Sequence, residues 1–150
     1  MDLRMIEVRR ATVEDIHKAQ KNALDVFKHE GGLLDGTLNC IENGRLYCLV
    51  SPDGYTLGVI GGVVIWPGVA SLGAILTRDI NLYPVAVART TNRIIEAVMS
   101  DLHLHRVEFA VKKDYPVGHR WAKALGFQAE GVLRQYSSDK TDYVMYGRLV

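Results

Sequence analysis

The sequence is poor in the features that mark several common classes of protein. Its only cysteines, Cys40 and Cys48, are too few for a disulfide framework and lack the spacing of metal ligands. Two reduced thiols are typical of a cytoplasmic protein, so we expect a cytoplasmic location. The net charge is only +1, which provides no global basic field for nucleic acid. Disulfide-rich and strongly basic classes of protein are therefore excluded.

Long hydrophobic runs are also missing. No run reaches the roughly 18–20 residues that a membrane span requires, and the longest, Thr56–Trp66, is broken by glycines. The first ten residues lack the apolar core of a signal peptide. The 150 residues are 48% hydrophobic and 23% charged, which suits one compact globular domain. Because no linker, repeat or low-complexity segment interrupts the chain, we expect a single domain over residues 1–150.

Periodicity predicts secondary structure in the order β-α-α-β-β-β-α-β-α-β-β. The strands are expected at Met5–Thr12, Arg45–Ser51, Thr56–Trp66, Ala70–Thr77, Arg106–Val111, Ala129–Tyr136 and Asp142–Val150. The helices are expected at Val13–Glu30, at Leu34–Glu42, from a first turn at Pro84 to about Leu102, and at Val117–Leu125. Thr12 and Asp15 have the spacing of a capping box at the start of the first helix.

The stretch Asn81–Ala86, with the sequence NLYPVA, lies between a predicted strand and a predicted helix. Many α/β proteins have a glycine-rich phosphate-binding loop at such a junction. Here the glycines are missing and Pro84 stands in the middle, where it suits the first turn of a helix. The junction is therefore either an eroded phosphate loop or a plain helix start.

The C-terminal third of the sequence contains a recognisable pattern. A short helix ends in Leu-Gly-Phe at Leu125–Phe127, Glu130-Gly131 starts a strand, and the sequence DYVMYGRL closes the chain at Asp142–Leu149. This run resembles the GNAT acyltransferase superfamily, and within it the ribosomal-protein and amino-acid N-acetyltransferases. The predicted element order is similar to that fold over nearly the whole chain. The resemblance implies one α+β domain with α/β/α layers, a mixed, mostly antiparallel sheet of about seven strands, and about four helices.

The resemblance also implies acetyl-CoA as co-substrate and an amine as acceptor. In this family the fourth strand binds the pantetheine arm through its backbone, and the following helix N-terminus binds the pyrophosphate. The family pattern Gln/Arg-x-x-Gly-x-Gly/Ala falls on Asn81-x-x-Pro84-x-Ala86, where only the last position fits. The implied cofactor-binding residues are Leu76, Thr77, Asn81, Leu82, Tyr83, Val85 and Ala86. Pro84 removes one N–H group, and the N–H groups of Leu82, Tyr83 and Val85 are expected to remain.

Acetyl transfer requires a base for the amine and a proton donor for the thiolate that leaves. The usual carboxylate of the fourth strand is absent from Ala70–Thr77, although Asp79 lies just beyond it. Glu108 is a second candidate, and a strand carboxylate paired with an arginine is the competing interpretation. Tyr115 occupies the position of a cofactor-binding asparagine in relatives, and it is either a proton donor or a packing residue.

Other residues near the predicted site are not expected to act in catalysis or to bind a metal. Ala122 stands where many relatives have a tyrosine that acts as general acid. His119 is expected to be an exposed helix histidine. His103 and His105 have no third ligand at a suitable spacing, so no metal site is predicted.

Two functions follow from the resemblance. The first is an N-acyltransferase that transfers acetyl from acetyl-CoA to an amine of a protein or small molecule. The alternative is a catalytically inactive GNAT-like binding or structural protein, because Leu76–Asp79 and the glycine-free helix start are similar to internal virion proteins of short-tailed bacteriophages. Such a phage protein would be virion-associated and would bind virion partners or copies of itself. Nucleic-acid binding through Arg89, Arg93 and the Arg9-Arg10 pair is a third interpretation, and solvated charged faces explain these residues more simply.

Overall fold

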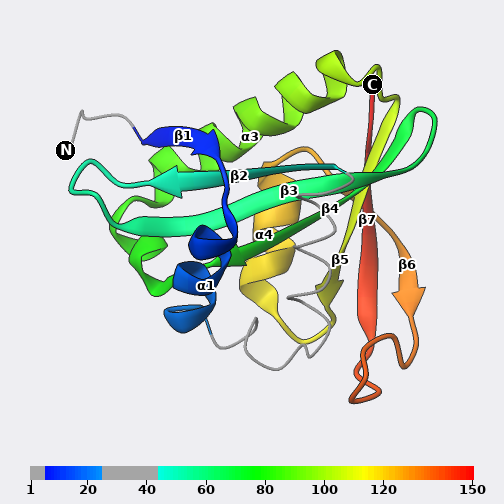
Figure 1. Ribbon diagram of the computed structural model, residues 1–150. Coiled ribbons are helices and arrows are strands. Elements are labelled where there is room, and N and C mark those ends of the chain that lie inside the picture. Colours follow the sequence, from blue (N-terminus) through cyan, green and yellow to red (C-terminus); the bar gives the residue numbers. More distant parts are fainter. Residues whose placement is uncertain (1–5, 25–43) are drawn as a thin grey trace. The chain divides into compact units, whose positions relative to one another are not determined.

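The computed structural model describes residues 6–24 and 44–150, which form one mixed seven-stranded sheet with helices (Figure 1). The strand order is β1-β2-β3-β4-β5-β7-β6. The strands are β1 (Glu7–Arg10), β2 (Gly44–Val50), β3 (Thr56–Trp66), β4 (Val69–Leu76), β5 (Arg106–Lys112), β6 (Gln128–Leu133) and β7 (Tyr143–Leu149). Strands β4 and β5 run parallel, whereas β1–β2, β2–β3, β5–β7 and β6–β7 are antiparallel. The expected α+β class with a mostly antiparallel sheet is confirmed.

The helices of the described residues are α1 (Val13–Lys21), the 3-10 helix η2 (Arg78–Leu82), α3 (Pro84–Asp101) and α4 (Pro116–Ala124). The helix expected at Leu34–Glu42 lies outside the described residues. Within those residues, no helix is long and apolar enough to cross a membrane. The chain divides into two compact units. The N-terminal unit comprises Met1–Val63 and Gly73–Thr91, and the C-terminal unit comprises Val64–Leu72 and Asn92–Val150.

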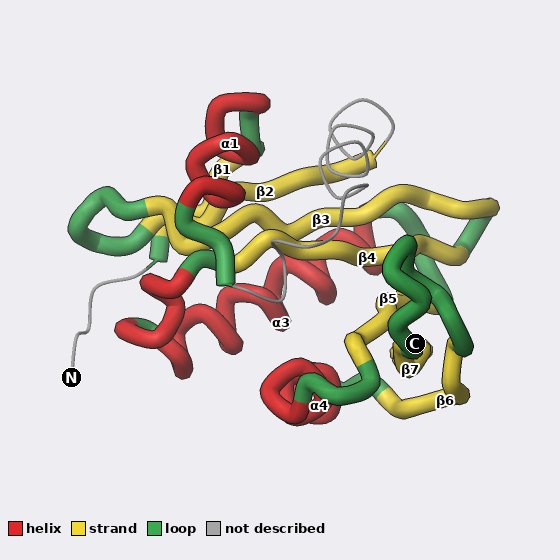
Figure 2. Tube along the Cα trace, turned by 90° about the horizontal axis from the view of Figure 1, so that it is seen from below, coloured by secondary structure: helices red, strands yellow, loops and turns green. Residues whose placement is uncertain are grey.

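In the N-terminal unit, α1 lies on one face of the strands and the start of α3 lies on the other (Figure 2). The core beneath α1 is built from alternate residues of the strands and from one stripe of the helix, as amphipathic packing requires. Its buried members are Ile16, Ala19, Ala23, Leu46, Cys48, Val50, Val59 and Ile75. In β3, Gly58 permits close approach of β4, because a Cβ there would lie 2.7 Å from the carbonyl oxygen of Ile75.

The capping box predicted for α1 is present. Thr12 Oγ1 accepts from the Asp15 N–H at 3.3 Å, and the Asp15 carboxylate accepts from the Thr12 N–H at 2.8 Å. The predicted extension of this helix to Glu30 is wrong, because α1 ends at Lys21. Residues 22–24 leave the helix, and Ala23 forms a β-bridge with Thr77.

In the C-terminal unit, α4 packs beside strands β5, β7 and β6 (Figure 2). The ring of Phe109 meets Phe127 edge-on at 4.7 Å and stacks near Tyr146 at 6.1 Å between centroids. Gly126 ends the α4 turn with φ +83°, a conformation that glycine adopts without a Cβ penalty. Strand β6 ends at Leu133, three residues earlier than predicted, because a turn begins at Arg134.

Candidate cofactor-binding site

The end of β4 is fixed by Thr77, which is fully buried. Its N–H donates to the carbonyl oxygen of Leu57 on β3 at 2.9 Å, and its hydroxyl donates to the same oxygen at 3.0 Å. Both donors of Thr77 are therefore engaged inside the N-terminal unit. Because backbone groups alternate in direction along a strand, those of Leu76 and Arg78 point to the opposite edge of β4.

That opposite edge is paired with the segment that follows α1. The Leu24 N–H donates to the Leu76 carbonyl oxygen at 2.9 Å, and the Arg78 N–H donates to the Asn22 carbonyl oxygen at 3.2 Å. These two bonds flank the antiparallel bridge between Ala23 and Thr77. A carbonyl that the resemblance assigns to the pantetheine arm, that of Leu76, thus has a partner from the chain itself.

The helix η2 connects β4 to α3 and was not predicted from the sequence. The Tyr83 N–H donates to the Ile80 carbonyl oxygen at 3.0 Å, and the Val87 N–H makes the first α-helical bond to Tyr83 at 2.9 Å. The expectation that the Tyr83 N–H is free is therefore wrong. Pro84 has no N–H, so Val85 and Ala86 supply the N–H groups that the first turn of α3 leaves without a helical partner.

The side chains around this helix start leave it accessible. Asn81 is exposed, and the exposed fractions of Leu82 and Val85 are 70% and 62%. Ala86 and Asp79 are half-buried. The first turn of α3 contains no acidic residue that would repel an anion. The arrangement fits a pyrophosphate with two backbone donors and the helix dipole, whereas the β4 edge fits a pantetheine arm only when Leu24 releases Leu76.

Tyr115 lies in the C-terminal unit, where it precedes the first residue of α4. Its N–H donates to the Lys112 carbonyl oxygen at 3.1 Å, and its half-buried ring packs against Gly118 of the same helix. A Cβ at Gly118 would lie 2.8 Å from the ring, so glycine is required for this packing. Burial raises the pKa of the Tyr115 phenol above its usual value. The phenol therefore keeps its proton at neutral pH and is chemically able to donate it.

Glu108 belongs to a cluster of charges on β5 and β6. Arg106 contacts Glu108 at 3.4 Å and binds both carboxylate oxygens of Glu130, at 2.9 and 2.6 Å. Through its hydrogen bond, Arg106 lowers the pKa of the Glu130 carboxyl. Glu108 is thus paired with an arginine, as the competing interpretation of this residue expected.

A hydrogen-bonded pair that the sequence did not reveal lies between α4 and β7. His119 Nε2 is 2.8 Å from the Lys113 carbonyl oxygen, and His119 Nδ1 is 2.7 Å from the Tyr146 hydroxyl. Because the carbonyl can only accept, Nε2 carries a proton, and in the neutral imidazole Nδ1 accepts from the Tyr146 hydroxyl. The expectation of an exposed helix histidine is wrong, since the ring is half-buried and bonded on both nitrogens. The partner lies 27 residues away, so no local pattern could identify it.

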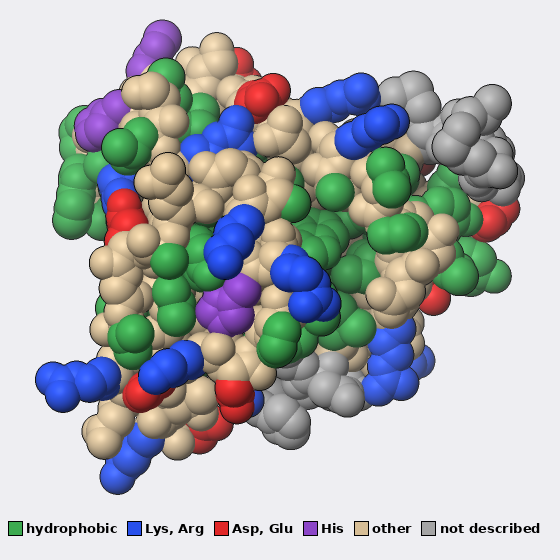
Figure 3. Space-filling view, turned by 180° about the vertical axis from the view of Figure 1, so that it is seen from behind, with side chains coloured by type: hydrophobic (Ala, Val, Ile, Leu, Met, Phe, Trp, Pro, Cys, Tyr) green, Lys and Arg blue, Asp and Glu red, His purple; other side chains and the backbone are tan. Residues whose placement is uncertain are grey.

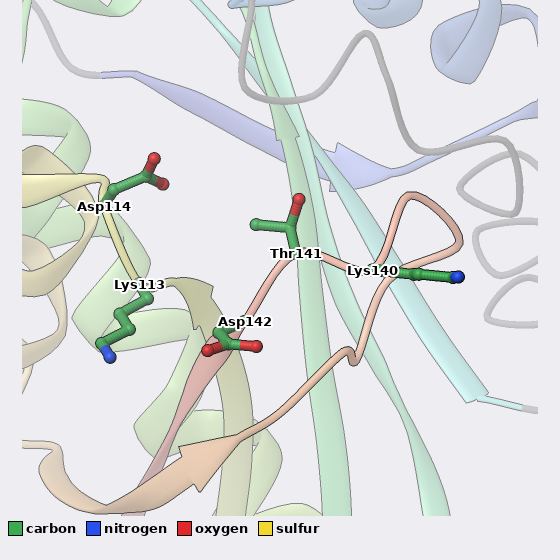
Figure 4. A pocket seen from close by; sticks show the side chains of 5 residues that line it. All are labelled: Lys113, Asp114, Lys140, Thr141 and Asp142. Carbon is green, nitrogen blue, oxygen red and sulfur yellow. The ribbon is translucent and has the colours of Figure 1, made fainter.

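An open hollow of about 530 Å³ lies in the C-terminal unit (Figure 4). Its lining residues are Lys113, Asp114, Lys140, Thr141 and Asp142. They come from two loops, one after β5 and one between β6 and β7. A hydrogen bond joins the two loops, because the Lys113 N–H donates to the Asp142 carbonyl oxygen at 2.9 Å. Its charge is mixed, and the Lys140 side chain points away from the other four in Figure 4.

Basic side chains do not form one surface on the side of the molecule that Figure 3 shows. The described Lys and Arg side chains there occur at separate places, with hydrophobic and neutral atoms between them. Nothing in this distribution favours a nucleic-acid partner. Within residues 6–24 and 44–150, no group of three His, Cys, Asp or Glu side chains is placed to hold a metal ion.

Comparison with known proteins gives a match in structure. No known family profile matches the chain, and no curated protein matches it in sequence. A spermidine N-acetyltransferase, a SpeG chimera from Vibrio cholerae and hSSAT, is similar with a TM-score of 0.77 and 15% identity, over 97% of this chain and 96% of that one. A ribosomal-protein-alanine N-acetyltransferase from Brucella melitensis is similar with a TM-score of 0.73 and 14% identity, over 96% and 99%. The expected GNAT-like fold is confirmed, and identities this low establish the fold alone.

Proposed function

We propose that this chain, which has the GNAT-like fold, is an N-acyltransferase that moves an acetyl group from acetyl-CoA to an amine. The observation that carries the proposal is the start of α3. Strand β4 is followed by the five-residue 3-10 helix η2 and then by α3, whose first turn contains no acid. The N–H groups of Val85 and Ala86 in that turn are left without helical partners. Such an end attracts the pyrophosphate of an acyl-CoA through its donors and its dipole.

The chain also supplies groups suited to the chemistry. The neutral amine attacks the thioester carbonyl, the carbon–sulfur bond breaks, and the sulfur requires a proton. The Tyr115 phenol keeps its proton at neutral pH and is assigned that donation. Asp79, half-buried in η2, is assigned to accept the proton of the amine, because Arg106 already pairs with Glu108. The acceptor is an amine of a protein or small molecule.

A catalytically inactive GNAT-like protein, such as an internal virion component of a bacteriophage, is the second candidate. Two observations favour it: Pro84, which stands where the family pattern has a glycine, has no N–H to offer a phosphate, and the Leu76 carbonyl is already bonded to Leu24. A lost hydrogen bond to a charged phosphate costs about 1.5–3 kcal/mol. This corresponds to about one to two decades of affinity, which would weaken a micromolar site without abolishing it.

Isothermal titration calorimetry with acetyl-CoA separates the two candidates. We expect saturable binding with a dissociation constant of about 10–100 µM, after a loss of one to two decades from a micromolar site. An amine screen that follows release of free thiol would then identify the acceptor class. The absence of heat at millimolar acetyl-CoA would reject the enzyme and leave the inactive candidate.

A further inference from the structure

We propose that the segment Asn22–Leu24 is a built-in competitor for the β4 edge, and that acetyl-CoA binding must displace it. The inference rests on the proposed function and concerns the regulation of that same site. Its starting point is the pairing of Leu76, the last residue of β4, and of Arg78 just beyond it, on the side that faces away from β3. A strand edge accepts one partner strand at a spacing of about 4.8 Å, so this segment and a ligand arm cannot both lie along it.

The hydrogen bonds define what must be exchanged. The Leu76 carbonyl accepts from Leu24, and the single N–H of Arg78 donates to Asn22. An extended amide-bearing chain, such as the pantetheine arm, would offer the same donor and acceptor types to the same edge. Displacement therefore replaces the hydrogen bonds of the segment with similar hydrogen bonds of the ligand, and the net change in free energy is small.

The segment is also held weakly enough to be displaced. Beyond the two backbone bonds, its main apolar anchor is Ala23, whose exposed fraction is 1% and whose side chain is a single methyl group in the core beneath α1. Leu24 is only half-buried, and Asn22 is exposed. Helix α1 itself is anchored separately by Ile16, Ala19 and its capping box. The segment can therefore leave β4 while α1 stays in place.

The substitution Leu24→Pro tests this competition, because proline removes the N–H that bonds to Leu76. Ala23 already pairs in a β-bridge, so it has the extended conformation that a following proline favours. Leu24→Ala is the matched control, since it shortens the side chain and keeps the N–H. We expect Leu24→Pro to bind acetyl-CoA about two- to tenfold more tightly than Leu24→Ala, the range of one net hydrogen bond.

Hydrogen exchange of the unmodified protein provides a second measurement that does not depend on the fold of a variant. With saturating acetyl-CoA, the Leu24 amide should exchange faster, while the Thr77 amide, which bonds to β3, should stay protected. Wild-type binding together with a protected Leu24 amide and equal affinities of the two Leu24 variants would overturn this inference and leave the proposed function intact. If neither wild type nor Leu24→Pro binds millimolar acetyl-CoA, the proposed function and this inference both fail.

Discussion

Helices α3 and α4 begin with the same three residues, Tyr-Pro-Val, at Tyr83–Val85 and Tyr115–Val117. Neither first turn contains an acid, and in both the tyrosine N–H donates to the carbonyl three residues earlier. Only α3 is expected to hold a phosphate. The chain therefore uses proline as an ordinary helix start, and Pro84 alone is no sign of a lost phosphate loop.

The two starts differ in what surrounds them. Tyr83 follows a 3-10 helix and its hydroxyl donates to Asp53 Oδ2 at 3.0 Å, so this tyrosine is tied to the β2–β3 turn. Tyr115 follows β5, and its hydroxyl forms no hydrogen bond with any described residue. One start thus presents backbone donors and the other presents a phenol. In the function that we propose, this difference separates a binding role for the α3 start from a proton-donating role for Tyr115.

Helix α1 is a third start and the contrasting case, because the chain itself satisfies its end. Asp15, with an exposed fraction of 2%, accepts from the Thr12 N–H and binds Arg9 with both oxygens, at 2.6 and 2.8 Å. A carboxylate of the chain occupies the place that an anionic ligand would take at α3. We call the α1 start closed, because side chains of the chain itself bind its N-terminal groups, and the α3 start open, because it has no such partner among the described residues. The predictions below test this distinction.

Disrupting the closed start of α1 should have the largest effect, and that effect is on the stability of the protein. Asp15→Ala removes the Asp15 half of the capping box and the buried carboxylate that binds Arg9, and we expect it to lower the free energy of unfolding by about 3 kcal/mol. Urea denaturation measures the change. Glu14→Ala is the control, because Glu14 is exposed and its ion pair with Lys18, at 3.4 Å, lies on the surface; it should change stability by less than about 0.5 kcal/mol. Equal effects of the two substitutions would show that the capping box is not what closes this helix.

The phenol of the α4 start is the next test. Tyr115→Phe should lower kcat by about 100-fold with little change in acetyl-CoA affinity, because a positioned proton donor contributes about two decades or more. Tyr55→Phe, at an exposed turn, is the control and should retain the wild-type rate. Thiol release at saturating substrate measures both rates. An unchanged kcat would show that Tyr115 is a packing residue and not the proton donor.

Much of the fold was predictable because its signals are local. The run Thr56–Trp66 was placed to the residue, and the capping residues Thr12 and Asp15 were identified from their spacing. The end of α1 was not predictable. Its amphipathic pattern continues past Lys21, and the competing β-bridge to Thr77 is more than fifty residues distant in sequence.

The candidate site was predictable only as far as its position in the chain. The resemblance placed Asn81–Ala86 after the fourth strand, and the structure agrees on that order. Whether each N–H is free depends on η2, whose short turn carries no periodicity that a sequence would reveal. The His119–Tyr146 pair and the Leu24–Leu76 bond were missed because both join distant segments.

The matched proline starts allow a direct test of the α3 site. Pro84→Gly restores an N–H and removes the ring, so acetyl-CoA affinity should rise by about 10- to 100-fold. Pro84→Ala also restores the N–H and removes the ring, but it keeps a Cβ that limits the approach of the backbone, so it should give part of that gain. Pro116→Gly makes the same change at α4 and should leave the calorimetric affinity unaltered. A comparable gain at both helices, or at neither, would remove the distinction between the two starts.

The last predicted effect is the pH dependence of the closed start. Hydrogen bonding to Arg9 lowers the pKa of Asp15 from 3.8 to about 2. A carboxyl whose pKa is lower in the folded protein stabilises it above the unfolded pKa, and this contribution disappears as the pH falls from about 4 to about 2. The difference corresponds to roughly 2 kcal/mol. The stability gap between wild type and Asp15→Ala, measured by urea denaturation, should therefore narrow by that amount between pH 6 and pH 2. A gap that stays constant over this range would mean that Asp15 stabilises α1 without its charge, and that the α1 start is closed by hydrogen bonding alone.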